Sequence, residues 1–172
     1  MEENVKAVFI SNYINHHQIP FSNALYEQLG DDYHFIQTEP MEEERIAMGW
    51  GLDAATLPYV VWADREEERC RKLIEEADLV FAGWTKRLDL VLPRLSSGKL
   101  TFRVSERIYR EGQWKAISPK GLLAKYKEHI RFRNQPVWLL CCSPCLCPVP
   151  SAGSYVPREH SCVCRFRRHE TG

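Results

Sequence analysis

The chain has 172 residues, of which 44% are hydrophobic and 27% charged, and its formal net charge is zero. This length holds one domain, or one domain and a tail, and buries a normal core. The neutral charge gives no reason to expect a nucleic-acid partner, and no stretch reaches the roughly 18 apolar residues of a membrane helix. Because the acidic N-terminus also lacks the basic flank of a secretory signal, we expect a cytoplasmic protein, with contact to the inner face of a membrane left open.

Short apolar runs along the chain predict β-strands. They cover residues 5–10, 33–36, 59–62, 79–82, 100–104 and 137–141. Most of these runs are continuous rather than alternating, which is typical of strands that are covered on both faces in a parallel sheet.

Helical patterns separate these runs, at residues 20–29, 65–77, 86–95 and 119–132. Pro20 fits a first helical turn and Gly30 a helix C-cap, and Ser118 and Pro119 fit the start of the last helix. We expect an apolar stripe of each helix to face the core. The residues of the stripes are Phe21, Leu25 and Leu29, then Cys70, Leu73, Ile74 and Ala77, then Leu88, Val91, Leu92 and Leu95, and finally Leu122, Leu123, Tyr126 and Ile130.

Strands that alternate with helices predict an α/β fold: a Rossmann-like, three-layer domain with a mostly parallel sheet of about six strands. Ligands of such sheets bind at the carboxyl ends of the strands. The chemistry is therefore expected in the loops at residues 11–19, 83–86 and 105–115.

The first of these loops carries two histidines. It reads Ser11-Asn12-Tyr13-Ile14-Asn15-His16-His17-Gln18-Ile19-Pro20. An imidazole exchanges protons near neutral pH, and a helix start favours an anionic or hydroxyl-bearing ligand. We therefore take His17 and His16 as candidate catalytic residues and Ser11 and Asn12 as candidate binding residues. The alternative is a polar loop whose side chains only cap the helix.

The other two loops add further candidate binding residues. Trp84 is placed to stack on a sugar ring, although a packing role is equally compatible with its position. After the fifth predicted strand come Ser105, Glu106 and Arg107. Glu106 suits sugar hydroxyls and Arg107 a phosphate or carboxylate, and the alternative is a surface ion pair between the two.

Glycine-containing segments do not support a nucleotide cofactor. Gly49-Trp50-Gly51 lacks a third glycine and directly follows no strand, while Ser97-Gly98-Lys99 lacks the upstream glycine of a phosphate-binding loop. No Gly-x-Ser-x-Gly elbow is present either. We expect no cofactor and no metal in the body of the chain.

The last 31 residues, 142–172, break the α/β pattern. From residue 143 on, Cys, Pro, Ser and Arg supply sixteen of thirty residues, and Lys, Asp, Asn and Gln are absent. We expect this tail to be disordered or non-native, and the abrupt change suggests a shifted reading frame, which the coding DNA would test. The alternative is a zinc-dependent interaction segment, with ligands from Cys142, Cys145, Cys147, Cys162, Cys164, His160 and His169.

With these loops in view, residues 1–141 resemble the N-terminal domain of bacterial glycosyltransferases of the GT-B type. The resemblance rests on residues 8–22, on Phe102-Arg103-Val104-Ser105-Glu106-Arg107 and on Ser118-Pro119-Lys120-Gly121. It implies a domain that binds the sugar acceptor across a cleft from a donor domain. His16 or His17 would approach the reacting sugar, and Ser105, Glu106 and Arg107 would line the acceptor side.

The resemblance also implies the partners and the activity. The acceptor would be a glycan or a lipid-linked sugar, and a nucleotide-sugar donor would bind only to a full-length form. The basic stretch near Lys120–Arg133 is placed to meet a lipid-linked or phosphorylated acceptor. Because the tail replaces the expected donor domain, we expect the chain alone to be inactive. The alternative function is a non-enzymatic α/β module that binds carbohydrate or protein.

Overall fold

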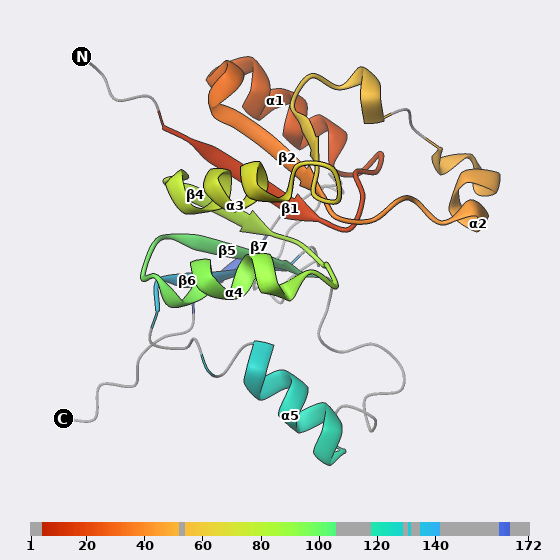
Figure 1. Ribbon diagram of the computed structural model, residues 1–172. Coiled ribbons are helices and arrows are strands. Elements are labelled where there is room, and N and C mark those ends of the chain that lie inside the picture. The colour runs from red at the N-terminus through yellow and green to blue at the C-terminus, as the bar shows by residue number, and fades with distance from the viewer. Residues whose placement is uncertain are drawn as a thin grey trace, which may run out of the picture.

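A sheet of parallel strands with helices against both faces forms the body of the protein (Figure 1). The computed structural model describes residues 5–51, 54–105, 118–128, 131, 135–141 and 162–165. In chain order the elements are β1 (Ala7–Ser11), α1 (Ile19–Leu29), η1 (Gly30–Asp32), β2 (Tyr33–Gln37), α2 (Glu43–Arg45), η2 (Ile46–Trp50), η3 (Ala54–Thr56), β3 (Val60–Trp62), α3 (Glu67–Glu76), β4 (Leu79–Ala82), α4 (Leu88–Ser96), β5 (Thr101–Ser105), α5 (Pro119–Glu128), β6 (Val137–Cys141) and β7 (Cys162–Arg165).

The strand order places the first strand in the interior of the sheet. The order is β3-β2-β1-β4-β5-β6-β7, and every pair from β3 to β6 is parallel. β7 pairs with β6 antiparallel. The direction of winding reverses between β1 and β4, which is where α/β sheets bind their ligands. The predicted α/β class with a parallel sheet is confirmed.

Two apolar clusters lie on opposite faces of this sheet, because side chains alternate along each strand. From β1, Val8 and Ile10 pack with Cys70 and Ile74 of α3 and with Val91 of α4. Ala7 and Phe9 of β1 face α1 in the second cluster. That cluster includes Ala7, Phe9, Phe35 and Phe81, with Leu25 and Leu29 of α1 packed against it. The stripe predicted for α3 is confirmed by the burial of Cys70, Ile74 and Ala77.

The stripe predicted for α1 is only partly correct. Leu25 and Leu29 are half-buried, but Phe21 is 41% exposed, and the one fully buried residue of the helix is Ser22. The Tyr33 hydroxyl donates a hydrogen bond of 2.8 Å to Ser22 Oγ. A small polar residue is therefore the part of α1 buried most deeply against the sheet, where it accepts a hydrogen bond from a buried tyrosine.

The inward stripe predicted for α5 is wrong. Leu122 and Leu123 are each 53% exposed and Tyr126 is 52% exposed. The helix stands apart from the sheet and its flanking helices, so within the part of the chain that the structure describes its apolar side has no core to face (Figure 1). Ile130, the last member of the predicted stripe, lies outside the described residues. The predicted start of α5 is confirmed, since Gly121 N donates to Ser118 Oγ at 3.1 Å.

Candidate functional site

The loops that follow β1 and β4 contact each other at the carboxyl edge of the sheet. Asn12 N donates to the Trp84 carbonyl at 2.7 Å, and Ser11 Oγ donates to the same carbonyl at 3.3 Å. Gly83 N donates to the Ile10 carbonyl at 2.8 Å. A Cβ at Gly83 would lie 2.9 Å from Ser11 Oγ, so the close approach of the two loops requires glycine there.

Buried polar side chains beneath these loops fix their positions. Gln37, at the end of β2, accepts a hydrogen bond from Ile14 N at 3.2 Å and donates one to the Glu39 carbonyl at 3.0 Å. Thr38 Oγ1 lies 2.7 Å from Thr85 Oγ1. Because these groups are buried and paired, they hold the loops after β1, β2 and β4 in one arrangement.

The two histidines of the first loop lie next to each other and are exposed. Asn15 Oδ1 accepts a hydrogen bond of 3.0 Å from His17 N, which closes the turn that leads into α1. The imidazole centroids of His16 and His17 are 3.9 Å apart. Within the described part of the chain, neither imidazole forms an ion pair with a carboxylate.

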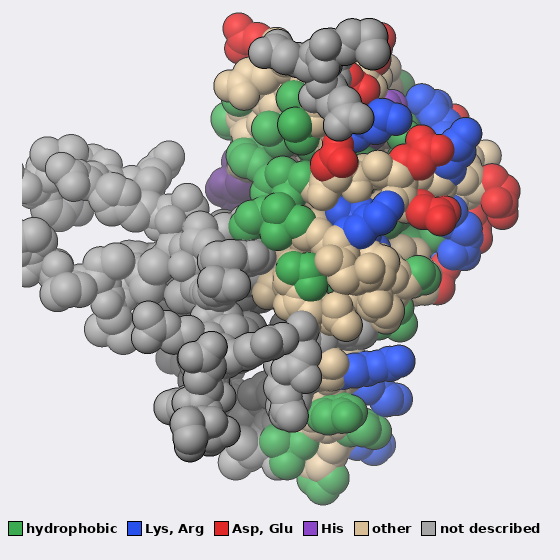
Figure 2. All heavy atoms as spheres, turned by 90° about the vertical axis from the view of Figure 1, so that its left-hand side faces the viewer, with side chains coloured by type: hydrophobic (Ala, Val, Ile, Leu, Met, Phe, Trp, Pro, Cys, Tyr) green, Lys and Arg blue, Asp and Glu red, His purple; other side chains and the backbone are tan. Residues whose placement is uncertain are grey.

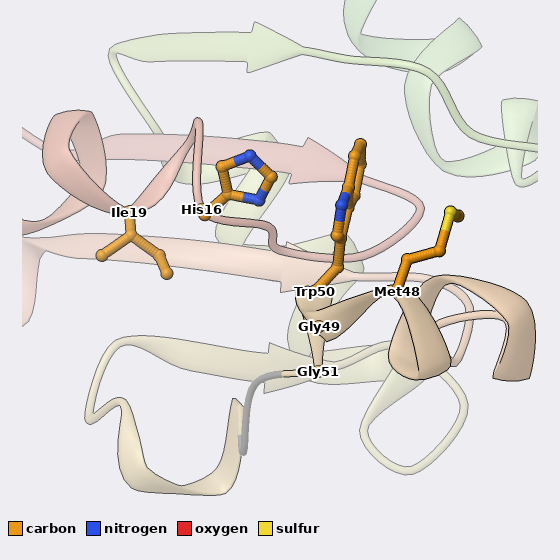
Figure 3. A pocket seen from close by; sticks show the side chains of 6 residues that line it. All are labelled: His16, Ile19, Met48, Gly49, Trp50 and Gly51. Carbon is orange, nitrogen blue, oxygen red and sulfur yellow. The ribbon is translucent and has the colours of Figure 1, made fainter.

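A pocket of about 380 Å³ opens between this loop and η2. His16 and Ile19 line one side, and Met48 and Trp50 line the other, together with Gly49 and Gly51. In Figure 3 the Trp50 indole stands between His16 and Met48. The His16 and Trp50 centroids are 4.7 Å apart with perpendicular rings, a favourable edge-to-face geometry.

The other contacts of Trp50 attach η2 and α2 to the site. The Arg45 guanidinium lies 4.7 Å from the indole centroid, and the His17 ring lies 6.0 Å from it. Gly49 has a φ of 84°, a left-handed conformation that glycine adopts without strain. The indole therefore bridges the loop after β1 and the segment after β2.

Trp84 presents an aromatic ring on the carboxyl-edge loops that is 61% exposed. Lys86 Nζ lies 5.8 Å from its ring centroid and 2.7 Å from Glu39 Oε2. The hydrogen bond to Glu39 raises the pKa of Lys86. With its indole outside the core, Trp84 is free to stack on the apolar face of a ligand.

The one arginine of the loop after β4 is already occupied by carboxylates. Arg87 Nε lies 2.9 Å from Asp89 Oδ1, and Arg87 Nη2 lies 2.8 Å from Glu67 Oε2. Arg71 contacts the same two carboxylates at 2.7 and 3.0 Å. Hydrogen bonds from Arg71, which has the larger effect, and from Arg87 lower the pKa of Glu67. This network joins α3 to α4 and leaves no guanidinium there to hold a ligand phosphate.

The predicted site residues fall into three groups. Ser11, Asn12 and Trp84 are brought together by backbone contacts, and His16 and His17 lie farther along the same loop. Ser105 ends β5, next to β4 and at the same edge of the sheet. Glu106 and Arg107 lie outside the described residues.

Sequence reasoning missed the residues that complete the pocket. Trp50 and Met48 lie in a segment whose glycines suggested only an incomplete dinucleotide motif, and Arg45 lies in an acidic stretch. One signal in the sequence could have indicated them: Trp50 lies between two glycines in a stretch with no strand pattern. A large aromatic residue in such a stretch is not required for a core, which makes it a candidate for a binding site. Its contact with His16 depends on how the chain returns after β2.

Neither a metal centre nor a membrane span is found in the described residues. No three His, Cys, Asp or Glu side chains gather there as a metal ion would require. None of the helices in that part has the length and apolar run needed to cross a bilayer. The sequence matches no family model, and comparison with curated proteins and with solved structures gives no match.

Proposed function

We propose that this chain is the acceptor-binding domain of a glycosyltransferase of the GT-B type. The observation that carries the proposal is the placement of exposed Trp84 beside the histidine loop, at the reversal between β1 and β4. An exposed indole next to hydrogen-bonded polar side chains suits a sugar, because a sugar ring has an apolar face and hydroxyl groups around its edge.

Each part of the site has a role in this proposal. The Trp84 ring stacks on the sugar, and the side chain of Asn12 offers hydrogen bonds to its hydroxyls, while buried Ser11 orients that side chain by donating from Oγ to Asn12 Oδ1 at 3.1 Å. His17 or His16 accepts the proton of the attacking hydroxyl group as a general base. Ser105, Glu106 and Arg107 would extend the acceptor side.

The proposed setting is polysaccharide biosynthesis in the cytoplasm, at the inner face of the membrane. The acceptor is a glycan or a lipid-linked sugar. A nucleotide-sugar donor would bind to a second domain facing this edge of the sheet, where positive groups and helix N-termini stabilise the leaving diphosphate. This Rossmann-like domain would contribute acceptor binding and the proton acceptor.

A sugar-binding experiment tests the proposal. Methyl glycosides of glucose, galactose and N-acetylglucosamine are titrated into the purified chain, and ligand contact is followed by saturation-transfer NMR. Trp84→Ala removes the stacking surface and is expected to weaken binding about tenfold, the equivalent of roughly 1.4 kcal/mol. Leu100→Ala is the control, since Leu100 is exposed and precedes β5 at the opposite edge. Equal affinity in Trp84→Ala and in the unmodified chain would refute the proposal.

A second candidate function, a non-enzymatic carbohydrate- or protein-binding module, is favoured by one observation. In the described residues, neither His16 nor His17 has a carboxylate partner to orient it as a base. His17→Ala separates the two functions. Loss of nucleotide-sugar turnover with sugar binding intact supports the transferase, whereas sugar binding without any turnover, in the full-length protein, supports the module.

A further inference from the structure

Helix α5 exposes a continuous apolar stripe. Leu122 and Leu123 lie four and three residues before Tyr126, so all three share one side of the helix, and more than half of each is exposed. Figure 2 shows hydrophobic and basic side chains next to each other at the lower end of the molecule, where α5 lies. Three large apolar residues on ten helical positions indicate a surface that is covered by something else.

Two exposed lysines border this stripe. By helical register Lys120 and Lys127 fall on the same side of it. Lysines at the border of an apolar stripe extend their ammonium groups to lipid phosphates while their methylene stems lie along the acyl region.

The charge distribution of the chain selects one orientation toward an anionic surface. Residues 99–133 contain ten basic and three acidic residues, whereas residues 27–78 contain five basic and fifteen acidic residues. An anionic bilayer attracts the first segment and repels the second. A protein groove would also accept the apolar stripe, but it would not account for two exposed lysines beside that stripe in a basic segment.

We propose that α5 docks in the interface of an anionic lipid bilayer, with Leu122, Leu123 and Tyr126 in the acyl boundary and the lysines at the phosphates. Ser118 and Pro119 fix the first turn of this helix. The inference deepens the membrane contact included in the proposed function. The acceptor-binding edge would thereby be held near lipid-linked substrates.

Vesicle co-sedimentation tests the inference. The purified chain is mixed with vesicles of phosphatidylcholine alone or of equal parts phosphatidylcholine and phosphatidylglycerol. Binding is expected only to the anionic vesicles and is expected to weaken as salt rises. Lys127→Glu should lower the partition coefficient more than fivefold, because each lysine near such a surface contributes about fivefold in affinity. Leu122→Ser with Leu123→Ser should lower it about tenfold or more.

Matched variants elsewhere on the surface serve as controls. Lys72→Glu changes an exposed lysine of α3, and Val5→Ser changes an exposed apolar residue near β1. Circular dichroism spectra confirm that each variant is folded. Equal binding to neutral vesicles, or equal loss of binding in the controls, would overturn the inference. So would sedimentation velocity that shows a dimer dependent on Leu122 and no vesicle binding. Sugar binding in solution needs no vesicle, so failure here is distinguishable from failure of the proposed function.

Discussion

Replacing Arg94 by methionine is expected to destabilise the fold more than any surface substitution. Arg94 is 2% exposed and lies on α4, and its guanidinium points at the amino edge of the sheet. Its nitrogens donate to the carbonyls of Ala77 at 2.6 Å, Asp78 at 2.9 Å and Leu100 at 2.9 Å. A single side chain thereby satisfies carbonyl groups after α3 and before β5.

The expected loss in the free energy of unfolding follows from the hydrogen bonds that these carbonyls lose in Arg94→Met. A hydrogen bond from a charged donor contributes about 1.5–3 kcal/mol net, and these three do not add fully because one residue makes them all. Burial of the guanidinium has its own cost, which lowers the pKa of Arg94. Methionine fills the space but donates nothing to these backbone oxygens, of which the Ala77 carbonyl is buried. We expect a loss of about 3–5 kcal/mol in the free energy of unfolding, a large share of a domain's stability.

Urea unfolding followed by tryptophan fluorescence and circular dichroism measures this loss. Arg69→Met is the control, because Arg69 is an exposed arginine of α3 that pairs with Glu66. Its loss should cost less than about 1 kcal/mol. The loss of unfolding free energy in Arg94→Lys should lie between those of Arg94→Met and Arg69→Met, because one ammonium group reaches fewer of the carbonyls. If Arg94→Met and Arg69→Met have the same free energy of unfolding, Arg94 does not hold these segments together.

Three further predictions concern burial and close packing. Burial, and to a smaller extent the charge of Arg69, lower the pKa of His34 from its usual value of 6.5. The contribution of His34 to the free energy of unfolding is therefore complete above about pH 6.5 and decreases as the pH drops toward the folded-state pKa. His34→Gln should flatten that dependence in urea unfolding between about pH 7 and 5, and an unchanged slope would contradict it. Burial raises the pKa of Cys70 to about 11, so iodoacetamide at about pH 8 should label this thiol, as read by peptide mass spectrometry, only after unfolding. Gly83→Ala places a Cβ 2.9 Å from Ser11 Oγ and should lower the free energy of unfolding by about 1–3 kcal/mol, which an unchanged thermal midpoint would disprove.

The amino-acid sequence by itself determined the α/β class, the parallel sheet and the positions of most elements. Runs such as Val8–Ile10 and Val80–Ala82 are apolar at every position because both faces of the sheet are covered. The local sequence alone therefore indicates that these strands are buried. Gly30 and Ser118 marked helix ends because capping depends only on adjacent residues. The carboxyl edge followed from the strand direction.

Only the tertiary structure decided which residues meet across elements. The contact of Trp50 with His16 joins segments that follow different strands, and the burial of Arg94 requires backbone carbonyls from two other parts of the chain. The exposure of Leu122 was equally hidden, because helical periodicity shows that a helix has an apolar side but not what lies opposite it. The local sequence pattern shows whether a residue favours burial. Which other residue it contacts is determined by the strand order and the path of the chain.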